Sequence, residues 1–209
     1  MTKRRALRRS AARPARDGLL ASFRASLAIA AALYVGAACL APRTASAADY
    51  YLEGSVLGGA TTWSPTDRNI QGALRTGFSF GDIVGVEVQG RLGYAAVDQR
   101  MLEALGAGTK LSIPIKPVAP HLRLGMIHMH EEPVAAVSND PAGAIVGVGD
   151  GIRHRFGIES ALGLDWVFAK TKRVRFLASA EGYVDVFPDV KGPLLYSGGG
   201  LGIGLQYHL

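Results

Sequence analysis

The residues best suited to chemistry are two histidines, His128 and His130, which are followed at once by Glu131 and Glu132. Imidazole nitrogens and carboxylate oxygens both bind zinc and related ions. A strand would place the two histidines on one face, and His121, in the opposite phase, on the other. Two ligands do not make a metal site, and no third ligand is fixed in sequence. We therefore predict no metal site and interpret the pair as polar residues where a strand leaves a bilayer.

Two glycine-rich segments superficially resemble phosphate-binding loops. Only five residues follow the segment 198–204, too few for the helix whose N-terminus would hold a phosphate. The segment 106–110, GAGTK, lacks the Gly-Lys-Ser/Thr order of such loops. We predict no cofactor, and expect these glycines to relieve crowding inside a narrow barrel or to let a strand bend.

No nucleophile is paired with a base in the sequence. Ser160, Ser179 and Ser197 have no adjacent base, and the chain has no His-x-Ser pair, which lipid A deacylases of this size carry on a strand. Spacing alone leaves a distant catalytic triad open. Since nothing positive supports catalysis, we expect a protein that is not an enzyme.

The elements that must position these residues are strands, because apolar residues recur at every second position after residue 48. In VRFLASAEGYVDVF, residues 174–187, the even positions are apolar and the odd positions include Arg175, Glu181 and Asp185. A helix would scatter these residues around its circumference. The same pattern predicts eight strands, near residues 50–62, 71–80, 83–96, 103–115, 119–131, 153–169, 174–187 and 194–209.

The polar faces of these strands hold six acids and five bases. They are Glu53, Arg75, Glu87, Arg91, Lys110, Arg123, Glu159, Asp165, Arg175, Glu181 and Asp185. A soluble barrel would turn these charges outward, whereas a membrane barrel would enclose them and turn its apolar face to lipid. The connections favour the membrane barrel, because short turns at 81–82, 116–118 and 170–173 alternate with longer loops at 63–70, 132–152 and 188–193. We predict a charge network in the lumen.

Aromatic residues give a second indication of a membrane barrel. They gather where the predicted strands end, as expected for girdles at the two membrane interfaces. The short-turn girdle would hold Tyr50, Tyr51, Phe78, Phe80, Trp166, Phe168, Phe176 and Tyr207, and the long-loop girdle Trp63, Tyr94 and Phe187.

Residues 1–47 differ in composition from the remainder. They hold nine of the 23 Lys and Arg residues and one of the 17 Asp and Glu residues, a net charge of +8 that accounts for the positive charge of the whole chain, +6. An arginine-rich start, the apolar run 26–41 and the small residues 45–47 are the three parts of a signal peptide. The apolar run falls just short of the length that spans a bilayer. We predict cleavage before Ala48, with Sec and twin-Arg export both open.

The predicted mature chain, residues 48–209, has 14 bases against 16 acids and no cysteine, because Cys39 lies in the leader. Without a basic surface, nucleic acid is not an expected partner. A cysteine-free exported chain is typical of the cell envelope.

The whole of residues 48–209 resembles the small bacterial outer-membrane β-barrels of the OmpA/OmpX/OmpW-like, eight-stranded group. Amphipathic strands such as GIESALGLDWVF and the C-terminal strand LLYSGGGLGIGLQYHL carry the resemblance. It implies an all-β, antiparallel, up-and-down transmembrane barrel in the outer membrane, with outer-membrane lipid and the barrel-assembly machinery as partners.

Eight strands leave room inside only for side chains, so we expect no open pore. The first functional hypothesis is a structural or surface-interaction protein, with a possible extracellular partner contacting residues 132–152. We expect apolar stretches of that segment to extend the flanking strands as a hairpin. The alternatives are a conduit or binder of small hydrophobic molecules and a soluble periplasmic ligand-binding barrel.

Overall fold

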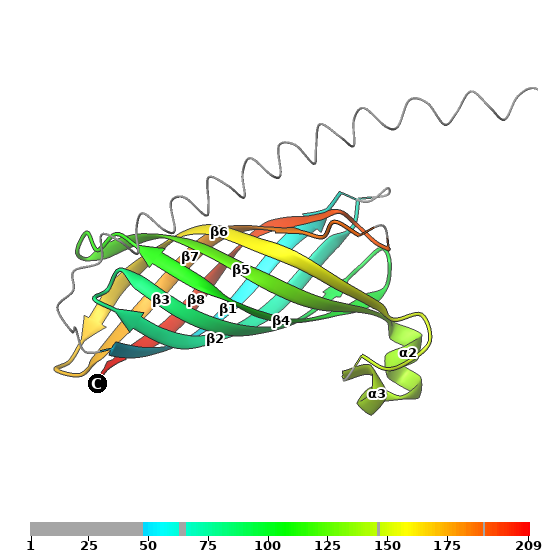
Figure 1. The fold of residues 1–209 in the computed structure, drawn as a ribbon, viewed down its shortest axis with the longest axis horizontal. Coiled ribbons are helices and arrows are strands. Elements are labelled where there is room, and N and C mark those ends of the chain that lie inside the picture. Colours follow the sequence, from blue (N-terminus) through cyan, green and yellow to red (C-terminus); the bar gives the residue numbers. More distant parts are fainter. Residues whose placement is uncertain (1–47, 63–65, 146, 190) are drawn as a thin grey trace, which may run out of the picture. The chain divides into compact units, whose positions relative to one another are not determined.

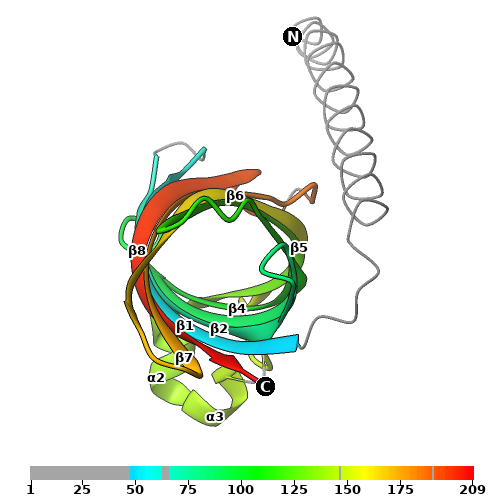
Figure 2. The same ribbon diagram turned by 90° about the vertical axis from the view of Figure 1, so that its left-hand side faces the viewer.

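A computed structural model describes residues 48–62, 66–145, 147–189 and 191–209. Eight strands form a closed barrel in which each strand pairs antiparallel with its neighbours in sequence and β8 returns to pair with β1 (Figures 1 and 2). The strands are β1 Ala48–Thr61, β2 Arg68–Phe80, β3 Val84–Ala95, β4 Arg100–Ser112, β5 Val118–Pro133, β6 Arg153–Lys170, β7 Val174–Val186 and β8 Leu195–His208. The predicted signal peptide, residues 1–47, lies outside the described residues.

The predicted strand count and antiparallel order are confirmed, and every strand end lies within three residues of its predicted position. The turn between β2 and β3 shows why the sequence folds locally in this way. Gly81 and Asp82 both have positive φ, at 64° and 60°, and the N–H of Ile83 donates to the carbonyl of Phe80 at 3.2 Å. Two consecutive residues with positive φ thus form a tight turn within the three-residue link 81–83.

The two ends of the barrel have different connections. At the turn end, the links are residues 81–83, 113–117 and 171–173. At the loop end, they are residues 62–67, 96–99, 134–152 and 187–194. The link 96–99 is shorter than the link 113–117 at the opposite end, so loop length follows parity only in part. The longest link remains residues 134–152.

The longest loop is helical, so the expected hairpin extension is wrong. β5 continues to Pro133, and two short helices follow, α2 Val134–Asn139 and α3 Pro141–Ile145. Pro133 has no N–H with which to extend a strand ladder, and Asp140 begins α3 by accepting the N–H of Gly143 at 3.0 Å. The helices lie outside the ring of strands, and α2 contacts β4 and β5 (Figure 2). In the described residues, no helix is both long and apolar enough to cross a membrane.

Alternate residues on every strand point into the barrel and out of it. The outer wall exposes large apolar side chains such as Val56, Leu105 and Leu162, whereas charged side chains are buried inside. A soluble barrel requires the reverse, so this alternative is wrong for the wall. Four inward positions in the middle of β8 are glycines: Gly198, Gly200, Gly202 and Gly204. A Cβ at Gly200 would overlap the Leu57 side chain and the Val56 carbonyl. The prediction that these glycines relieve crowding is therefore confirmed.

Candidate functional site

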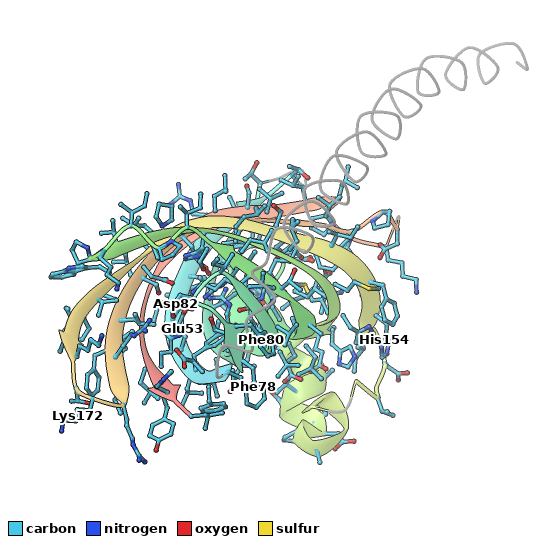
Figure 3. All side chains as sticks on the ribbon, turned by 60° about the vertical axis from the view of Figure 1, so that its left-hand side comes forward. Glu53, Phe78, Phe80, Asp82, His154 and Lys172 are labelled. Atoms are coloured by element: carbon cyan, nitrogen blue, oxygen red, sulfur yellow. The ribbon has the colours of Figure 1, made fainter. Side chains whose placement is uncertain are left out.

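Two arginines cross the middle of the lumen from different walls. Arg75 on β2 binds Glu53 at 3.1 Å and Glu181 at 2.5 Å. Arg123 on β5 binds the same two carboxylates, at 2.7 Å and 2.6 Å, and lies 3.5 Å from Glu87. Figure 3 shows Glu53 within the barrel. Because both acids bridge both guanidinium groups, four strands are joined through the lumen as well as around its wall.

A second layer lies toward the loop end. Arg91 on β3 binds Asp185 through two hydrogen bonds, at 2.9 and 3.1 Å, and Glu159 at 2.8 Å. Its guanidinium carbon also lies 5.6 Å from the centre of the Tyr183 ring. Charge-assisted, bidentate pairs of this kind are the strong ones in a water-poor interior. This layer joins β3, β6 and β7.

A third layer lies toward the turn end. Lys110 binds Asp165 at 2.6 Å, and His121 Nδ1 lies 3.3 Å from the other oxygen of that carboxylate. Arg175 departs from the pattern, because it binds Asp82 of the β2–β3 turn at 2.6 Å and is partly exposed. All eleven residues of the predicted network thus point into the barrel, but Arg175 pairs at its mouth.

Sequence analysis missed a fourth cluster near the loop end. Arg155 binds Glu131 at 2.6 Å and Asp189 at 3.1 Å, and Tyr196 donates to Glu131 at 2.8 Å. The Arg155 guanidinium also packs on the Phe187 ring, 4.6 Å from its centre. A signal was present, since Arg155 is in phase with Glu159 along one strand. Glu131 was instead assigned to the point where its strand leaves the bilayer.

The larger spaces in the lumen lie at its two ends. A cavity of about 250 Å³ opens beside Lys110 and Arg175 at the turn end. Another of about 200 Å³ lies beside Asp67 and Tyr196 at the loop end. Between them, a space beside Arg123 measures about 10 Å³, at the lower limit of what one water molecule needs. Within the described residues, side chains therefore fill the middle of the barrel.

A histidine cluster lies on the outer wall at the loop end. His128 and His130 point outward from β5, and their Nε2 atoms are 2.7 Å apart. His154 of β6 lies directly opposite His130 in the strand register, and their ring centres are 4.6 Å apart. Figure 3 shows His154 on β6 at the end of the barrel that carries α2 and α3. One ring nitrogen from each of the three histidines lies within 4.8 Å of the others.

Two carboxylates accompany the histidines. Glu103 of β4 lies opposite His130 of β5 in the register, and Glu132 is two residues after His130 on β5. One oxygen from each acid and a ring nitrogen of His130 lie within 4.8 Å of one another. Glu132 is fully buried, yet neither carboxylate oxygen has a hydrogen-bond partner among the described residues. The group could hold a metal ion, and the structure supplies the third histidine that spacing along one strand did not reveal.

The barrel is similar to solved outer-membrane barrels. The crystal structure of Neisserial surface protein A aligns with a TM-score of 0.54 and 16% identity, covering 78% of this chain and 99% of that one. The fold is that of the small eight-stranded outer-membrane barrels.

Two further barrels align at lower similarity. They are the N-terminal barrel domain of Pseudomonas aeruginosa OprF (TM-score 0.42, 18% identity, 75% of this chain and 97% of that one) and Ail of Yersinia pestis (0.47, 12%, 78% and 99%). No protein-family model matches the chain, and no curated protein sequence matches it.

The structure shows which of the predicted girdle aromatics point outward from the barrel. Seven of the eight residues predicted for the short-turn girdle point outward: Tyr50, Phe78, Phe80, Trp166, Phe168, Phe176 and Tyr207. The prediction is wrong for Tyr51 and Phe187, which are buried in the lumen. At the loop end, Tyr94 is exposed as predicted, Phe156 was missed, and Trp63 lies outside the described residues.

Proposed function

We propose that this chain is an outer-membrane protein whose closed barrel anchors and displays the segment 134–152 at the cell surface. The observation that carries the proposal is the crossing of Arg75 and Arg123 through the lumen, where each binds both Glu53 and Glu181. A barrel filled in this way serves as a rigid support and passes little. Its specific contribution must then come from its exposed surfaces.

The outer wall supports a location in the membrane. Apolar side chains cover it, with exposed fractions of 71% for Leu201 and Ile203 and 72% for Met126. Exposing this surface to water would cost about 25 cal/mol of free energy for each Å² of apolar area, whereas contact with lipid avoids that cost. Outer-membrane lipid is therefore the first partner, and insertion of such a barrel calls for the barrel-assembly machinery.

The segment 134–152 is the surface best placed for an external partner. It is the longest link of the barrel, and its helices lie outside the ring of strands at the end opposite the C-terminus (Figures 1 and 2). Neither α2 nor α3 has an acidic residue in its first turn or a basic one in its last. A partner would meet a weakly charged, alanine-rich surface. Catalysis is not part of this proposal.

An epitope inserted after Asn139 tests the proposed display. We expect the full chain to fractionate with the outer membrane and the epitope to be stained on intact cells. The matched control carries the same epitope after Lys172, in the turn at the other end, and should be stained only after permeabilisation. Staining with the reverse pattern would contradict the proposed orientation, and recovery in the soluble fraction would contradict the membrane location.

A further inference from the structure

We propose that the outer wall carries a binding site for one divalent transition-metal ion of the zinc type, held by His128, His130 and His154. The site lies outside the lumen, so it is separate from the charge network. Nothing in its geometry depends on which compartment the loop end faces.

Strand geometry brings the three imidazoles together. His128 and His130 are two residues apart on β5, so their side chains leave the same face. His154 enters from the neighbouring strand as the direct partner of His130, at the position where cross-strand side chains are closest. The His128 and His130 Nε2 atoms are 2.7 Å apart, within hydrogen-bond distance, and an ion bound by both would replace this contact and move the two nitrogens apart. Three nitrogens converging from two adjacent strands are the protein ligands of an open zinc site.

Two carboxylates lie beside His130, the histidine at the centre of the cluster. Glu132 is an acid buried without a hydrogen-bond partner among the described residues, and its charged form is costly unless a cation compensates it. Glu103 and Glu132 both lie within 4.8 Å of a His130 ring nitrogen. No hydrogen bond joins either acid to His130 in the part of the chain that the structure describes, so a carboxylate would have to move closer to accept the second ring N–H and fix the imidazole's orientation.

The donor set selects the class of ion. Imidazole suits zinc, copper and nickel, whereas calcium and magnesium prefer sites built from oxygen alone. With three nitrogens and no thiolate, the site favours a borderline ion over a soft one. Zinc fits this set with ordinary Zn–N distances of about 2.0–2.1 Å.

The site would also fasten the loop to the barrel. Gly147 packs against His130 so closely that a Cβ there would overlap the imidazole ring, and its φ of +74° favours glycine. The Phe156 ring packs on His128, with centres 4.1 Å apart. An ion bound by β5 and β6 would therefore lie between the apolar wall and the loop 134–152. It would link the two strands to the part of the loop around Gly147.

Zinc binding to the full chain, purified from membranes in detergent, tests the proposal. Titration calorimetry with zinc chloride should give one Zn²⁺ per chain, and X-ray absorption of the loaded protein should give a first shell containing three imidazole nitrogens. We expect His154→Ala and His130→Ala each to lower the affinity about 100-fold, and Glu103→Gln to lower it about tenfold. His208→Ala is the matched control, because His208 binds Asp49 at the turn end, and it should keep the affinity of the unmodified chain.

A second measurement keeps the test independent of folding. His154 is exposed, so His154→Ala should leave the barrel resistant to protease, and zinc should slow proteinase K cleavage within 134–152 only in chains that retain all three histidines. The proposal would be overturned by an absence of binding at millimolar zinc. An equal affinity in His154→Ala and the unmodified chain, or a first shell of oxygen alone, would also overturn it.

Discussion

The lumen and the loop end of the outer wall both carry acids on strand faces, but the acids have different partners. Inside, Glu53 and Glu181 each bind two arginines, and Asp185 receives two hydrogen bonds from one guanidinium. Outside, Glu103 and Glu132 have no ion pair within 4 Å among the described residues. These carboxylates in the lumen are therefore neutralised by arginines, whereas the carboxylates on the outer wall have a histidine nearby instead.

This difference separates a structural role from a binding role. A buried charge that is fully paired stabilises a particular packing and has little left to offer a ligand. A buried acid without an ion-pair partner, such as Glu132 beside His130, is stabilised by taking up a proton or a cation. The lumen is thus interpreted as the scaffold of the protein, and the outer cluster as a place where something from outside can bind.

Breaking one member of a lumen pair should have the largest effect. We expect Lys110→Met to lower the free energy of unfolding by about 3–5 kcal/mol, because Asp165 would stay buried without its ammonium partner. The double variant Lys110→Met with Asp165→Leu should recover most of that loss. Urea titration of the barrel in lipid vesicles measures both. Equal losses in the single and double variants would contradict the assignment of this pair as a mutually neutralised unit.

Placing arginine on the two faces of the wall sharpens the comparison. Arginine at the outward positions Leu164 or Val184 should cost up to about 2–4 kcal/mol, and arginine at Val86 should cost less, because Val86 lies opposite Phe78 of the turn-end girdle. Arginine at Gln89 should cost less, because Gln89 lies in the lumen beside the Glu159 carboxylate. The yield of folded barrel in outer-membrane fractions measures this order. Equal tolerance at both sets of positions would contradict the orientation of the wall.

The contact between the loop and the outer cluster should be less costly to break. Gly147→Ala should destabilise the loop by about 1–3 kcal/mol, since alanine is strained at positive φ and its Cβ would meet His130. Faster proteinase K cleavage of 134–152, with an unchanged barrel unfolding midpoint, is the expected result. Gly72→Ala is a control, because its nearest neighbour would be 3.9 Å away. Unchanged cleavage in Gly147→Ala would show that the loop does not rest on the histidines.

The smallest expected effect is local to α3. Asp140→Ala removes the side chain that accepts the Gly143 N–H, and losing such a cap costs about 1 kcal/mol. Hydrogen exchange at residues 141–145 should become faster, while exchange in the barrel strands stays the same. If exchange spread into β5, the loop would be coupled to the wall more tightly than the structure indicates.

The strands, and the face of each strand that points into the lumen, could be predicted because both depend on a local period of two residues. Arg75 and Glu181 could be placed in the lumen from phase alone, without knowledge of their partners. Pairing depends on strand register, which is why the Arg175 contact with Asp82 was not foreseen. The histidine cluster was missed for the same reason, because His130 and His154 meet only after the loop 134–152 sets the β5–β6 register. Helical structure in that loop was missed because its apolar residues were interpreted as strand.

Conductance of the full chain in a planar lipid bilayer tests the central claim most directly, because it reports on the lumen alone. The arginines that cross the barrel, and the space of about 10 Å³ beside Arg123, predict a membrane whose current stays at the level of the lipid after insertion. Insertion is verified in the same sample by the protease resistance of the barrel. A large and steady open-channel current would contradict a lumen closed by paired charges.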